Sequence, residues 1–229
     1  MVMRKVICTV ILSVFLCVSA PPAMADMIDL TTSGATGSIN DALFYEAHAA
    51  STGSGVIDSF VRIATNDAIE EGYNTGYRPL EFDENSSPTF THNLLLSDVP
   101  IVNLGGTDYR EFLLDINQNK SGDGRLLSLD EIEIYLSDVA NRTGYSSGWG
   151  DPIWELDDGA NNWIKLDYSL NTGSGSGDMF AYIPNDLFAG GDYVYLYSQF
   201  GVNFANTANF EEWAVRTGAD APHTPVPGA

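Results

Sequence analysis

The chain has 229 residues, with 31 acidic side chains against 10 basic ones and a formal net charge of −21. Nucleic acid and anionic membrane surfaces repel such a charge, so both are excluded as partners. Divalent cations are the partners that this charge attracts. Both cysteines lie within the first 17 residues, so the rest of the chain cannot form a disulfide.

Residues 1–25 resemble a secretory signal peptide. Arg4 and Lys5 give the positive start, residues 6–18 are apolar, and small residues precede a cleavage point ahead of Asp26. The apolar run is shorter than the ~20 residues that cross a bilayer, so we expect cleavage rather than an anchor. The exported chain would then carry no membrane span.

The remainder predicts one all-β domain, an antiparallel β-sandwich or jelly roll with few short helical turns. We expect a flexible lead-in at 26–37, the sandwich at 38–216 and a Pro-rich tail at 217–229. Short apolar or alternating runs between Gly, Asn, Asp and Ser predict the strands. The expected strands are 56–63, 90–96, 101–104, 109–114, 131–136, 163–168, 179–183, 193–197 and 211–215, and residues 66–71 predict one or two helical turns.

The most specific chemistry lies between Asp115 and Glu131. Short oxygen-bearing side chains alternate there, followed by Asp-Gly and two adjacent carboxylates, as in a Ca²⁺ loop. A register that starts at Asn119 places Gly124 at the turn and Asp130 at the closing position, and it fits better than one that starts at Asp115. A third reading treats 120–122 as an insertion.

The three readings use different subsets of the oxygen-bearing side chains in this segment. The candidate metal ligands are Asp115, Asn117, Asn119, Asp123, Asp130 and Glu131. Because the flanks predict strands rather than helices, a bound Ca²⁺ ion would clamp two strands of the sandwich. The alternative is an Asn/Asp/Gly-rich loop that makes turns and binds nothing.

No catalytic motif accompanies this segment. The three histidines, His48, His92 and His223, have no metal-binding spacing. Paired carboxylates of a hydrolase meet only in three dimensions, so a pair cannot be chosen from the sequence. The four tryptophans and eleven tyrosines would either stack on sugars or fill the core.

Several blocks of sequence resemble secreted bacterial proteins of unknown function that often carry a PEP-CTERM-type sorting tail. These blocks are 53–62, 71–75, 91–98, 112–118, 127–131, 173–179, 193–197 and 210–213, and they span most of the chain. The resemblance implies export to the envelope or extracellular matrix of a Gram-negative bacterium and implies no activity. Residues 224–229 begin like such a tail but lack its Pro-Glu-Pro core, so anchoring is left open.

The sequence therefore predicts an exported, non-enzymatic, Ca²⁺-binding β-sandwich with a structural or adhesive role at the cell surface or in the matrix. Extracellular polysaccharide and surface proteins are the expected macromolecular partners. The alternatives are a carbohydrate-binding module with exposed tryptophans and, ranked third, a secreted carboxylate-dependent hydrolase.

Overall fold

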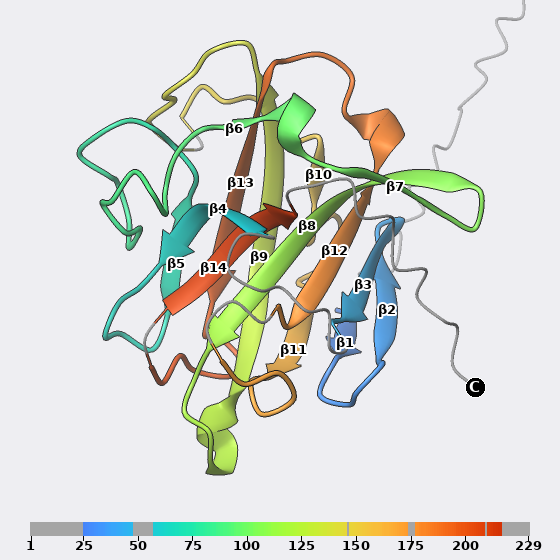
Figure 1. The fold of residues 1–229 in the computed structure, drawn as a ribbon, viewed down its shortest axis with the longest axis vertical. Helices are drawn as coiled ribbons and strands as arrows, with labels where there is room; N and C mark the ends of the chain where they lie inside the picture. The colour runs from blue at the N-terminus through green and yellow to red at the C-terminus, as the bar shows by residue number, and fades with distance from the viewer. Residues whose placement is uncertain (1–24, 48–56, 146, 174–176, 209, 217–229) are drawn as a thin grey trace, which may run out of the picture.

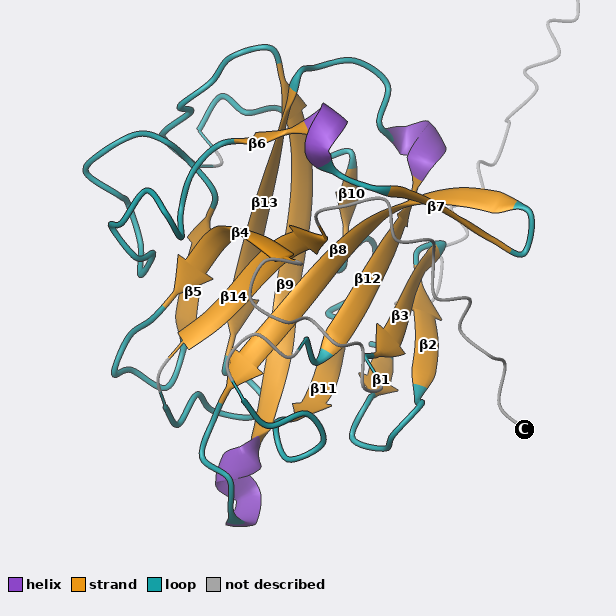
Figure 2. Cartoon of the chain, viewed as in Figure 1, coloured by secondary structure: helices purple, strands orange, loops and turns teal. Residues whose placement is uncertain are grey.

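The computed structural model describes residues 25–47, 57–145, 147–173, 177–208 and 210–216. Two seven-stranded sheets form a sandwich, and the only helices in the described ranges are three short 3₁₀ turns, so the expected all-β class is confirmed (Figures 1 and 2). These turns are η1 (Leu96–Asp98), η2 (Gly122–Arg125) and η3 (Asn185–Leu187). No described helix has the length and apolar character that crossing a membrane requires.

The first sheet, called sheet A, is built around the long strand β9 and has the order β1-β11-β9-β13-β5. Its strands are β1 (Met27–Asp29), β11 (Trp163–Asp167), β9 (Leu126–Ser137), β13 (Tyr193–Phe200) and β5 (Glu70–Tyr73), with β10 (Trp154–Glu155) paired to β9 and β6 (Leu94–Leu95) to β13. Every pairing is antiparallel except that of β1 with β11.

The second sheet, sheet B, has the order β2-β3-β12-β8-β14-β4, with β7 paired to β8. Its strands are β2 (Thr36–Ile39), β3 (Ala42–Glu46), β12 (Met179–Pro184), β8 (Thr107–Asn117), β14 (Phe210–Arg216), β4 (Ile57–Ile63) and β7 (Ile101–Leu104). The chain crosses from sheet B to sheet A between β8 and β9, inside the acidic segment 115–131.

The main core fills the space between the two sheets, where alternate residues of each strand point inward. On β9, Leu127, Leu129, Ile132 and Ile134 belong to this core, as does Trp213 of β14. The register between β9 and β13 shifts at Asp130, which is why two adjacent residues, 130 and 131, both lie off the core. This shift positions the carboxylates of the acidic segment.

Three expectations about elements are wrong. The lead-in 26–37 contains β1, whose Ile28 is buried, so this segment belongs to the sandwich. Residues 66–71 form no helix, because 70–73 pair with β13 as strand β5. The strand expected at 90–96 shrinks to the two residues of β6. The expected signal peptide (1–25) lies outside the described residues apart from Ala25, and the tail 217–229 lies wholly outside them.

Candidate functional site

The structure divides the six predicted metal ligands between two sheets. Asp115 and Asn117 lie on β8 of sheet B, and Asp130 and Glu131 lie on β9 of sheet A. Only Asn119 and Asp123 remain in the connection. The alternation of oxygen-bearing side chains at 115 and 117 is therefore the polar face of a strand, which has the same period of two.

Asp115 points away from the inter-sheet core. Its neighbours Leu114 and Ile116 belong to that core, so Asp115 lies on the outer face of sheet B, opposite Glu212 of β14. It is buried there, and Asp178 lies near it. Burial, together with the Asp115 charge, raises the pKa of Asp178 well above its usual range.

Asp130 is saturated by hydrogen bonds from the protein. Its Oδ2 accepts from Ser128 Oγ and Val202 N, both at 2.7 Å. Its Oδ1 accepts from Asn203 Nδ2 at 2.7 Å and from Asn203 N at 3.3 Å. Because three of these four bonds hold the segment that follows β13, Asp130 has the contacts of a structural anchor rather than those of a metal ligand.

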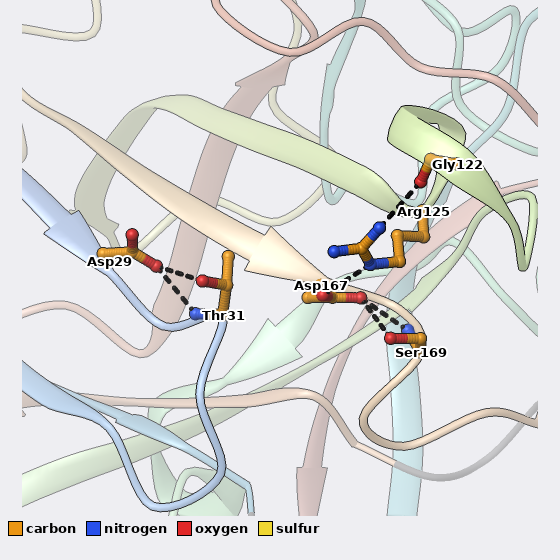
Figure 3. Close-up of polar contacts among 6 residues, drawn as sticks. All are labelled: Asp29, Thr31, Gly122, Arg125, Asp167 and Ser169. Atoms are coloured by element: carbon orange, nitrogen blue, oxygen red, sulfur yellow. Dashed lines mark hydrogen bonds and ion pairs between the residues drawn. The ribbon is translucent and has the colours of Figure 1, made fainter.

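The connection itself is also tied to neighbouring segments. Asn119 donates two hydrogen bonds to Thr207: its N donates to Thr207 Oγ1 at 3.3 Å and its Nδ2 to Thr207 O at 3.1 Å. Arg125 donates to Gly122 O at 2.9 Å and to Asp167 Oδ2 at 2.8 Å (Figure 3). Protein contacts thus fix this turn, with Asp123 exposed beside it.

Glu131 joins a cluster of carboxyl and phenol groups on the outer face of sheet A. Burial, and then the charge of Glu133, raise the pKa of Glu131 to about 7. Glu133 Oε2 accepts hydrogen bonds from Tyr135 and, at 2.8 Å, from Tyr145. The rings of Tyr145 and Tyr197 stack 4.0 Å apart above this strand face. The two glutamates are therefore part of a packed aromatic layer.

The described residues contain no group of three or more His, Cys, Asp or Glu side chains that could hold a metal ion. The oxygen atoms of the six candidates do not converge. Asp115 lies on the outer face of sheet B, and Asp130 lies on β9 of sheet A. The residues present therefore do not fit a single Ca²⁺ ion shared by the acidic segment. Calcium binding there stays a prediction, with no geometry to support it.

A groove of about 1120 Å³ is present at one end of the sandwich. Four segments line it: the β2–β3 turn, the β7–β8 hairpin, the residues around β10, and η3. Its five carboxylates are Asp41, Asp108, Glu155, Asp158 and Asp186, and no basic side chain is among its lining residues. Sequence reasoning missed this acidic groove because its members come from four distant loops; the only signal was that Asp and Asn recur at turns.

The tryptophans are placed mostly in the interior. Trp149, Trp154 and Trp213 are buried, and only Trp163 is partly exposed. Trp154 donates from Nε1 to Asn40 O at 2.9 Å, under the acidic groove. The indole rings therefore do not form the exposed sugar-stacking face that the carbohydrate-binding alternative required.

His92 lies in a loop rather than in the strand expected around it. Its Nδ1 is 2.8 Å from Asn93 O, and its Nε2 is 4.0 Å from Asp58 Oδ1. His48 and His223 lie outside the described residues.

The comparisons with known proteins add no family. No protein-family model, no curated protein and no solved structure matches the chain.

Proposed function

We propose that this protein is an exported, non-enzymatic adhesive module that holds a basic segment of a surface or matrix protein in the acidic groove. The observation that carries the proposal is the lining of the groove, with five carboxylates and no basic side chain. A cluster of one sign of charge in a concave site focuses the potential and attracts the opposite charge.

The groove carboxylates are available to a partner. Asp41, Asp108, Asp158 and Asp186 are exposed, and Glu155 is partly exposed. Burial and the neighbouring Glu133 raise the pKa of Glu155, which faces that residue across the β9–β10 pair. A bound Lys or Arg side chain would offset this repulsion, because it supplies the positive charge that the groove lacks.

Other features support binding over catalysis. Glu131 and Glu133, the acid pair that β9 brings side by side, lie under tyrosine rings, and both Tyr135 and Tyr145 donate to Glu133. Export is supported by the signal-like residues 1–25. A polysaccharide partner is less favoured by the groove, since three of the four tryptophans are buried.

The test is binding of a fluorescent oligo-lysine peptide, with a neutral oligosaccharide as the second probe, at two salt concentrations. The triple variant Asp108→Asn, Asp158→Asn, Asp186→Asn should weaken peptide binding by about tenfold, since each exposed charge pair contributes ~0.2–1 kcal/mol. The control carries the same change of charge outside the groove: Asp98→Asn, Asp138→Asn, Asp192→Asn. Equal losses in both triple variants, or binding of the oligosaccharide alone, would overturn the proposal.

A further inference from the structure

Two glutamates, one from each sheet, point into the space between the sheets. Glu70 of β5 and Glu211 of β14 are both 0% exposed. Glu211 lies on the same face of its strand as Trp213, which belongs to the core. Glu71 accepts a hydrogen bond from Tyr197 on the outer face of sheet A, so its neighbour Glu70 points the other way, toward the core. We call Glu70 and Glu211 the buried carboxylate pair.

Two amide side chains connect the pair into one network. Gln118 Nε2 donates to Glu211 Oε1 at 2.5 Å and to Asn206 Oδ1 at 3.0 Å. Asn206 Nδ2 in turn lies 3.3 Å from Glu70 Oε2. The orientation of Gln118 is set by Thr207, whose N and Oγ1 both donate to Gln118 Oε1 at 2.8 Å.

Three oxygen atoms converge at the Asn206 amide nitrogen. Besides Glu70 Oε2, the carbonyl oxygens of Thr65 and Asp67 lie 3.4 Å and 3.3 Å from Nδ2. An amide NH₂ group has only two hydrogens, and ordinary N–H···O bonds are about 2.9–3.0 Å long. A position surrounded by three oxygens therefore suits a cation better than it suits an NH₂ group with two hydrogens.

The backbone around this centre is held closely. Asn206 N donates to Ala68 O at 2.9 Å. Gly201 has a φ of +94°, and a Cβ atom there would lie 2.0 Å from Ala68 O. Only glycine fits at this position, so the segment before β5 and the segment after β13 are fixed against each other.

The pair lacks a compensating charge. Glu70 Oε1 and Glu211 Oε2 are buried and have no hydrogen-bond partner among the described residues, although the backbone of Thr65 interacts with the Glu70 carboxylate. Within the same residues, the ion pairs reach Asp58, Glu111, Asp167 and Glu212 but neither member of the pair. Buried carboxylates without a positive partner are strongly disfavoured unless a proton or a cation joins them.

We propose that Glu70 and Glu211 bind a divalent cation between the two sheets, together with the carbonyl oxygens of Thr65 and Asp67. The ion would displace the Asn206 NH₂ group from the centre of these oxygens. Mixed carboxylate and carbonyl ligands in irregular geometry favour Ca²⁺ over Mg²⁺, which demands a near-ideal octahedron. The site has only two carboxylates, and the backbone carbonyls supply its other ligands, so it is compatible with the absence of a group of three or more acidic side chains among the described residues. It shares no residue with the acidic groove.

The test is calorimetric titration of CaCl₂ into the purified, chelator-stripped chain, with thermal melts in parallel. We expect one ion per chain and a rise in Tm of about 5–10 °C at a hundredfold excess over Kd. Glu70→Gln and Glu211→Gln keep the size of the side chain and remove its charge, and each should weaken binding by at least about 100-fold. Asp123→Asn, in the acidic segment, is the matched control and should leave binding unchanged.

Three results would overturn the proposal. The first is no heat and no shift in Tm. The second is binding that survives both Gln variants and is lost with Asp123→Asn, which would return the ion to the acidic segment. The third is a rise in Tm of Glu70→Gln without Ca²⁺ while Ca²⁺ leaves the parent unchanged, which would assign a proton to the pair. Should a Gln variant fail to fold, Glu70→Asp keeps the charge but draws the carboxylate back by one CH₂ group. Ca²⁺ binding at this site should then weaken, so an affinity within twofold of the parent would also contradict the site.

Discussion

The acidic segment 115–131 and the buried carboxylate pair show opposite relations between sequence and structure. The acidic segment has its oxygens at regular spacing along the chain, yet Asp130 is satisfied by protein hydrogen bonds and Asp115 lies on another sheet. The pair comes from residues 141 positions apart, yet one network joins Glu70 and Glu211 and leaves an oxygen of each without a hydrogen bond from the described residues. The comparison teaches that oxygens brought together by packing, beside buried carboxylate oxygens without partners, are a better guide to an ion site than spacing along the chain.

Gln118 is the residue through which the two regions meet, so its replacement should have the largest effect. It is buried, lies within the acidic segment and donates to Glu211 Oε1 and Asn206 Oδ1. Gln118→Met keeps the volume but removes these bonds, including the side-chain donor that reaches Glu211 among the described residues. We expect a loss of about 3–4 kcal/mol in the free energy of unfolding, measured by urea denaturation in chelator.

The same variant sharpens the comparison when Ca²⁺ is added. An ion at the buried carboxylate pair would stabilise the Glu211 carboxylate in place of the lost amide donor, so the loss should shrink in Ca²⁺. A loss of the same size with and without Ca²⁺ would separate Gln118 from any ion site.

Asp130 tests the other side of the comparison. Asp130→Ala removes four hydrogen bonds that hold Ser128, Val202 and Asn203. We expect a loss of about 2–3 kcal/mol in the free energy of unfolding, because the backbone donors of residues 202 and 203 lose a charged acceptor. If Asp130 is an anchor, denaturation in Ca²⁺ and in chelator will show the same loss. A loss confined to the Ca²⁺ sample would identify Asp130 as an ion ligand after all.

The acidic segment also shows how far the sequence could lead. Clean alternation on one face, as at Ile132, Ile134 and Leu136, identified β9, and a Gly-containing turn identified the β7–β8 hairpin. β5 was missed because Glu70 and Glu71 are weak strand formers, and its strand form comes from pairing with β13. Pairing partners are distant in sequence, so no local pattern contains them.

The candidate sites were harder to predict for a similar reason. Asp115 and Asn117 alternate because they share one face of β8, and a loop ligand pattern has the same period. The acidic groove gathers five carboxylates from four loops, and the buried carboxylate pair gathers two from different sheets. Only the packing of the sandwich brings each set together.

Glu131 gives a pH-dependent test within the acidic segment. Burial and the Glu133 charge raise its folded-state pKa from 4.5 to about 7. The folded chain then holds a proton that the unfolded chain has released, so stability falls as the pH rises from about 4.5 to 7. Glu131→Gln should remove this fall and stabilise the protein at pH 8 by about 1 kcal/mol, since partial exposure weakens the effect. Melts from pH 4 to 8 measure it, and parallel curves for the parent and the variant would show that another group causes the slope.

Asp123 should give the smallest effect, and for that reason it is the most direct test of the acidic segment as an ion site. It is exposed in η2, next to Gly122, while Arg125 fixes the turn through Gly122 O and Asp167. Since the turn does not depend on the Asp123 carboxylate, Asp123→Ala should change the free energy of unfolding by less than about 0.5 kcal/mol, with or without Ca²⁺. A Ca²⁺ ion held in the register from Asn119 to Asp130 would use this carboxylate as a charged ligand. Thermal melts of Asp123→Ala that lose a Ca²⁺-dependent rise in Tm, while Glu70→Gln keeps it, would reverse the comparison between the two regions.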